Sequence, residues 1–120
     1  MSRILVIEDN EAVRTLIVAM LRDYTVFEAA NGREGLEVFK AQEPDLVITD
    51  MIMPEMGGLE TIAELHQLQN VPRIIAMSGS MSFPADEAAS VAQQMGVDRV
   101  LAKPFRLKEF LEAVHQLLAA

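Results

Sequence analysis

The sequence predicts one α/β domain over residues 1–120: a three-layer sandwich in which a five-stranded parallel sheet is covered by helices on both faces. Two observations lead to this fold class. Short apolar runs without polar alternation indicate parallel strands that are buried on both faces. Between these runs, apolar residues recur at helical spacing. Strand and helix patterns that alternate in this way predict right-handed crossovers between the strands.

The five expected strands are the apolar runs at residues 4–7, 26–27, 46–48, 74–77 and 100–101. Five helical patterns follow them. The first spans residues 13–21, and the last and clearest spans 107–118. Asn31 followed by Glu34 resembles a capping box that opens the second helix toward Phe39. A Gly57-Gly58 pair leads into the third helix, and the fourth, at residues 86–95, is rich in alanine and weaker.

Composition excludes several classes of function. A net charge of −8 argues against direct binding of nucleic acid, which depends on Lys and Arg neutralising phosphates. Without cysteine, the chain has no disulfide, thiol nucleophile or thiolate metal site. The first apolar run is far shorter than a signal-peptide core or the roughly 20 residues of a membrane helix. We therefore expect a soluble, cytoplasmic protein that does not contact a membrane.

Polar side chains follow four of the expected strands. Glu8-Asp9 follows the first strand, Asp50 the third, Ser78 the fourth and Lys103 the fifth. Open parallel sheets bind ligands in the crevice beyond the carboxyl ends of their strands, so these groups should share one pocket. The second strand has no comparable group, which predicts an edge strand outside the crevice.

Three carboxylates in one pocket repel one another. A pair 4 Å apart repels by about 4 kcal/mol at an effective dielectric constant near 20. A divalent cation would offset this repulsion. Mg²⁺ fits better than Zn²⁺ because it prefers oxygen ligands, and because His66 and His115 fall on helices away from the crevice. A phosphoryl group held there would face Asp50 and form an acyl phosphate, with Lys103 and Ser78 stabilising its other oxygens.

Four segments carry a resemblance to a known family. ILVIEDNEAVR, DLVITDMIMPEMGGLE, IIAMSGS and VLAKPF are similar to the receiver domain of two-component response regulators, and the likeness covers essentially the whole chain. It implies a flavodoxin-like sheet of order 2-1-3-4-5 with Asp50 as the phosphoacceptor. It also implies Mg²⁺ bound by Asp9, Asp50 and the backbone carbonyl of Ile52, with Glu8 assisting through water.

The resemblance implies further roles. Lys103 would pair with the acceptor or its phosphate, the bond before Pro104 would be cis, and Ser78 would be the switch hydroxyl. A sensor histidine kinase or a histidine phosphotransfer domain would donate the phosphoryl group. The domain would catalyse only its own phosphorylation and slow dephosphorylation, so it is not expected to be an enzyme. It would act on a downstream protein as a monomer or as a phosphorylation-dependent dimer.

Other interpretations compete with this one. Glu8-Asp9 or Asn10 could serve only to cap the first helix, and isolated Asp50 or Ser78 could be turn residues. A haloacid-dehalogenase-like phosphatase needs a second acid where this chain has Ile52. The acid pair disfavours a flavodoxin-like electron carrier, since it would repel the flavin phosphate. The strongest rival is a receiver-like interaction module that is not phosphorylated.

The chain also departs from the family pattern. Val100 stands where many receivers carry Tyr or Phe, so we expect the signal to run mainly through Ser78 and the loop that follows it. Ile52 and Ser80 occupy positions that tune hydrolysis of the acyl phosphate, and neither offers a carboxylate or amide to orient water. We therefore predict slow self-dephosphorylation.

Overall fold

The computed structural model describes residues 2–51, 58–78, 90, 93–102 and 105–119. Within them five parallel strands form a single sheet of order β2-β1-β3-β4-β5. The chain order is β1 (Arg3–Ile7), α1 (Glu11–Met20), β2 (Thr25–Ala29), α2 (Gly32–Gln42), β3 (Leu46–Asp50), α3 (Gly58–His66), β4 (Arg73–Ser78), β5 (Arg99–Ala102) and α5 (Leu107–Ala119). The predicted fold class and strand order are confirmed.

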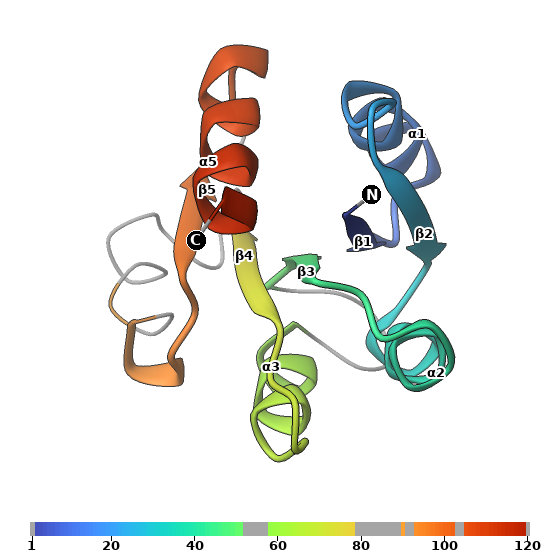
Figure 1. Ribbon diagram of the computed structural model, residues 1–120, viewed down its shortest axis with the longest axis vertical. Coiled ribbons are helices and arrows are strands. Elements are labelled where there is room, and N and C mark those ends of the chain that lie inside the picture. Colours follow the sequence, from blue (N-terminus) through green and yellow to red (C-terminus); the bar gives the residue numbers. More distant parts are fainter. Residues whose placement is uncertain (1, 52–57, 79–89, 91–92, 103–104, 120) are drawn as a thin grey trace.

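Helices cover the sheet on both faces, with α1 and α5 on one side and α2 and α3 on the other (Figure 1). The fourth expected helix falls mostly on residues outside the described part of the chain, although Ser90 and residues 93–95 are helical. β2 lies at one edge of the sheet, as its lack of a site residue predicts, and β5 lies at the other.

Two apolar clusters fill the space between the layers. Alternate side chains of each strand point to opposite faces, so Leu5 and Ile7 pack toward α2 and α3, whereas Ile4 and Val6 pack toward α1 and α5. The central strands β1, β3 and β4 are almost completely buried, which explains why their sequences show no polar alternation.

The ends of the helices are set by local hydrogen bonds. Asn10 and Asn31 are the N-caps of α1 and α2, where their side-chain oxygens accept hydrogen bonds from Val13 N (3.0 Å) and Glu34 N (2.8 Å). The helix expected to open at Asn31 is therefore confirmed. Glu43 is the C-cap of α2 and adopts the left-handed conformation with φ of 46°.

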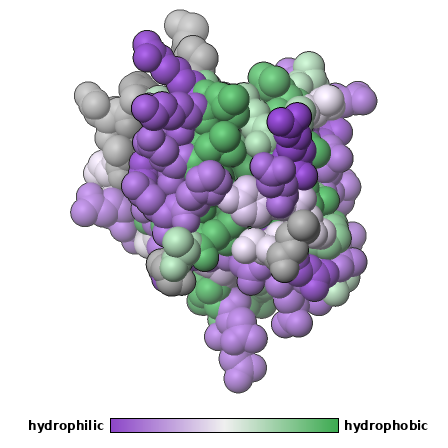
Figure 2. Space-filling model, turned by 45° about the horizontal axis from the view of Figure 1, so that its top comes forward, coloured by the Kyte–Doolittle hydropathy of each residue, from purple (hydrophilic) through white to green (hydrophobic). Residues whose placement is uncertain are grey.

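Apolar side chains also reach the surface on the side of α1 and α5. Figure 2 turns this side forward and shows hydrophobic side chains between hydrophilic ones. Leu16 of α1 is 58% exposed and Leu107 of α5 is 51% exposed. Single exposed apolar residues of this kind are normal on helices whose inner faces are packed.

Candidate functional site

Three carboxylates meet at the carboxyl edge of the sheet. Glu8, Asp9 and Asp50 each offer an oxygen atom, and these three atoms lie within 4.8 Å of one another. The register explains the meeting: Ile7 of β1 lies opposite Thr49 of β3, so the residues that follow them are neighbours. Glu8 is buried, Asp50 is half-buried and Asp9 is exposed, so the cluster opens to solvent on one side.

The turn between β1 and α1 holds the first two of these acids. The backbone N–H of Glu8 donates to the carbonyl oxygen of Ala29 (3.0 Å), which ties the turn to the end of β2. The N–H of Asn10 donates to Glu8 Oε2 (3.1 Å). Because Asn10 caps α1, capping does not require the carboxylate of Asp9.

Asp50 is held from the other side by the start of α3. Met51 N donates to the carbonyl of Met77 (3.0 Å), and Gly58 N donates to the carbonyl of Met51 (3.1 Å). A β carbon at Gly58 would overlap the backbone of Asp50 and Met51. Only glycine therefore lets the helix approach the strand end this closely.

Ser78 lies on the strand next to Asp50. Asp50 is paired with Met77 in the sheet, and Ser78 is the residue after Met77. Its hydroxyl oxygen is buried and has no hydrogen-bond partner among the described residues. A buried hydroxyl without a partner is costly in a folded protein and suits a group that bonds to a ligand.

The electrostatics of the cluster favour a bound cation. At 4.8 Å two carboxylates repel by about 3.5 kcal/mol with an effective dielectric constant of 20. The available donors are all carboxylate oxygens, which suit a hard divalent ion such as Mg²⁺. His66 ends α3 and His115 lies on α5, and neither belongs to the cluster. Their expected position away from the crevice is confirmed.

Sequence reasoning missed two residues that brace this site. Arg14 of α1 donates through Nη1 to the backbone carbonyl of Glu8 (2.8 Å) and through Nε to Glu28 of β2 (3.2 Å). The spacing in the sequence could have indicated Arg14. It lies three residues before the buried Ile17, so both side chains lie on the side of α1 that faces the sheet. β2 thus reaches the site indirectly.

Other expected site residues fall outside the described part of the chain. Lys103, Ile52, Pro104 and Ser80 belong to this group. Val100 is described: it is half-buried in β5 and packs against the apolar cluster on the side of α2 and α3.

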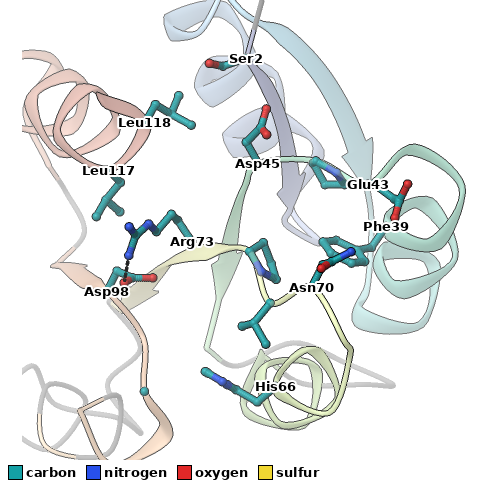
Figure 3. A pocket seen from close by; sticks show the side chains of 14 residues that line it. Ser2, Phe39, Glu43, Asp45, His66, Asn70, Arg73, Asp98, Leu117 and Leu118 are labelled. Carbon is teal, nitrogen blue, oxygen red and sulfur yellow. Dashed lines mark hydrogen bonds and ion pairs between the residues drawn. The ribbon is translucent and has the colours of Figure 1, made fainter. Parts of the chain in front are cut away.

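A separate hollow of about 980 Å³ opens at the opposite, amino edge of the sheet (Figure 3). Ser2, Asp45 and Arg73 line it from the starts of the strands, and Arg73 pairs there with Asp98 at 3.5 Å. None of the three clustered carboxylates lines it. Since parallel sheets bind ligands beyond their carboxyl ends, the acidic cluster is the better candidate site.

The described helices are α1, α2, α3 and α5, together with the short helical stretch at residues 93–95. Among these, no helix combines the length and the apolar character that crossing a bilayer requires.

The fold and the cluster define a class of protein: a doubly wound α/β domain whose acidic groups gather at the carboxyl edge of a parallel sheet. Comparison with known proteins gives the family. The family model described as the response regulator receiver domain matches residues 4–115, so the chain belongs to this family. Receiver domains obtain phosphoryl groups from histidine kinases and act on downstream targets in two-component signalling. They are switches and not classical enzymes.

Two individual relatives support the same family assignment. The chain is 36% identical over 120 residues to the nitrate/nitrite response regulator protein NarL of Escherichia coli (strain K12), covering 97% of this chain and 54% of NarL. It therefore spans about half the length of that relative. It is also 36% identical over 121 residues to the chemotaxis protein CheY of Bacillus subtilis (strain 168), covering 97% of each chain.

A solved structure supports the same family. The response regulator receiver domain protein from Clostridium thermocellum superposes with a TM-score of 0.88 at 26% identity, covering 99% of this chain and 95% of that chain.

Proposed function

We propose that the chain is a phosphorylation-activated switch in which Asp50 accepts a phosphoryl group in the presence of Mg²⁺. One observation carries the proposal: in a chain of the receiver family, Asp50 closes β3 with its carboxylate within 4.8 Å of those of Glu8 and Asp9. Residues 1–120 would form one receiver domain of a cytoplasmic protein that binds no nucleic acid itself.

Each residue has a distinct role in this proposal. A carboxylate oxygen of Asp50 attacks the phosphorus of a phosphohistidine on a sensor kinase or phosphotransfer domain. The new O–P bond forms as the P–N bond breaks, and the imidazole leaves with the electron pair. Mg²⁺, when bound by Glu8, Asp9 and Asp50 with the carbonyl of Ile52, supplies positive charge for the phosphoryl oxygens.

Ser78 and Lys103 would bind the remaining phosphoryl oxygens. The buried hydroxyl of Ser78, which has no partner among the described residues, supports its share of this role. An added phosphoryl group would draw Ser78 and the loop after it toward Asp50 and so change the surface offered to a downstream partner. Because Val100 is small and packed, we assign it no swinging movement.

The test compares Asp50→Ala with wild type, using Asp45→Ala at the opposite edge of the sheet as the matched control. Each protein is mixed with Mg²⁺ and either acetyl phosphate or beryllofluoride, and intact mass and NMR spectra are recorded. With acetyl phosphate, wild type and the control should gain the mass of one phosphoryl group, and with either reagent their spectra should change, whereas Asp50→Ala should show neither effect. If wild type stays unmodified and unchanged, the chain is a non-phosphorylated interaction module.

The lifetime of the acyl phosphate is a separate test. Ser80→Ala should leave the half-life nearly unchanged, because Ser80 is not expected to activate water. A half-life that lengthens greatly in this variant would contradict the prediction of slow self-dephosphorylation.

A further inference from the structure

We propose that Arg14 is a positioning residue that holds the peptide between Glu8 and Asp9 in the orientation needed to bind a divalent cation. This inference rests on the proposed function, because it concerns the same acidic cluster. It adds a residue outside the cluster and a link from the edge strand β2, which contributes no ligand of its own among the described residues.

The guanidinium of Arg14 bridges two segments. Nη1 donates to the backbone carbonyl of Glu8 at 2.8 Å, and Nε donates to Glu28 Oε1 at 3.2 Å. A guanidinium is a rigid, planar fork, so fixing two of its nitrogens fixes the direction of both hydrogen bonds. The peptide group is planar as well, so the bond to the Glu8 carbonyl also sets the plane that leads into Asp9.

The contact is better suited to holding geometry than to stabilising the fold. The Arg14 side chain is 17% exposed and that of Glu28 is 49% exposed, and ion pairs open to solvent contribute little to stability. The hydrogen bond to the carbonyl is partly buried and lies where the chain turns from one proposed ligand to the next. Groups that orient metal ligands in this way typically change metal affinity about 10–100-fold when they are removed.

Charge and positioning predict opposite results, which makes the inference testable. Arg14 is a cation beside a cation site, so removing its charge should strengthen Mg²⁺ binding if charge alone matters. If Arg14 holds the turn, its removal should weaken Mg²⁺ binding despite the more negative site.

The experiment measures Mg²⁺ affinity by isothermal titration calorimetry at constant ionic strength, together with the amide NMR signals of Asp9 and Asn10. Arg14→Met removes the charge and the donors but keeps an apolar stem. Arg14→Lys keeps the charge but loses the planar guanidinium and its paired donors. Arg73→Met is the matched control, since it removes the Arg73–Asp98 pair at the opposite edge with the same change in net charge. Ile17→Val loosens the packing of α1 without changing the turn.

We expect Arg14→Met to raise the Kd for Mg²⁺ about tenfold or more and to shift both amide signals. Arg14→Lys should also weaken binding, and this loss cannot come from net charge. In both controls the Kd for Mg²⁺ should stay within about twofold of the wild-type value. Binding by Arg14→Met that equals or exceeds wild type would overturn the inference. If that variant does not fold, wild-type affinity in Arg14→Lys would overturn it.

The wild-type titration separates this inference from the proposed function. A wild type without Mg²⁺ binding would overturn the Mg²⁺-dependent function and the inference with it. A wild type that binds Mg²⁺, with Arg14 variants that bind equally well, would refute the inference alone.

Discussion

Replacing Asp50 by Asn should stabilise the fold when no divalent cation is present. The substitution keeps the shape of the side chain and removes one charge from a cluster whose oxygens lie within 4.8 Å of one another. At that distance one carboxylate pair repels by about 0.9 kcal/mol in bulk water and about 3.5 kcal/mol at an effective dielectric constant of 20.

Burial decides where each pair falls in this range. Glu8 is buried, so its repulsion of Asp50 lies toward the upper value. Asp9 is exposed, so its repulsion of Asp50 lies near the lower value. The two pairs together give about 2–4 kcal/mol. An amide accepts hydrogen bonds less strongly than a carboxylate, so we expect a net gain of about 2 kcal/mol in the free energy of unfolding.

Mg²⁺ should narrow this difference at ten times its Kd and reverse it near one hundred times its Kd, where binding contributes about 2.7 kcal/mol. A ligand that binds only the folded state stabilises it by about 1.4 kcal/mol at ten times its Kd. Wild type should therefore gain stability with Mg²⁺, whereas Asp50→Asn, which has lost a ligand, should gain much less. Urea unfolding followed by circular dichroism, with a chelator and then with Mg²⁺ at constant ionic strength, measures both effects.

Asp45→Asn is the matched control for this experiment. Asp45 lies at the amino edge of the sheet, where its carboxylate accepts a hydrogen bond from Arg3 N at 2.9 Å. The change removes the same charge without relieving the cluster, so stability should fall slightly relative to wild type, and this difference should be the same with and without Mg²⁺. The electrostatic argument is refuted if Asp50→Asn is no more stable than wild type in chelator, or if Mg²⁺ stabilises both equally.

Three further predictions concern the scaffold, and urea unfolding measures each of them. Gly58→Ala should cost about 1–3 kcal/mol, because its β carbon overlaps the backbone of Asp50 and Met51; wild-type stability in this variant would show that α3 shifts freely. Glu43→Gly should add about 1 kcal/mol, because Glu43 is the C-cap of α2 at a φ of 46° that glycine adopts without strain; a loss of stability would contradict this explanation. Burial, and secondarily the charge of Asp23, raises the pKa of Tyr24 above its usual 10.0. The unfolded chain then ionises first, so stability should fall as pH rises from about 10, and Tyr24→Phe should lack this part of the alkaline loss. Equal losses in both proteins between pH 9 and 11 would exclude Tyr24 as the cause.

The sequence alone determined the layers of the fold and the edge of the sheet that carries the acids. Residues 4–7 and 46–48 are unbroken apolar runs because their strands are covered on both faces, and β1 and β3 follow these runs closely. The edge strand β2 was predicted over two residues but spans Thr25–Ala29. As an edge strand it is less covered, and Thr25 and Glu28, which point to opposite faces of the sheet, are both exposed, so the apolar run is shorter than the strand.

Tertiary structure decided how the site is braced. The link from Arg14 to Glu28 and to the Glu8 carbonyl depends on the pairing of β1 with β2 and on the direction in which α1 presents one side chain. The close approach of Gly58 to Asp50 depends on the angle at which α3 meets β3. Periodicity records which face of an element is buried, but contacts between distant elements arise only when strand register and helix packing set side-chain directions in space.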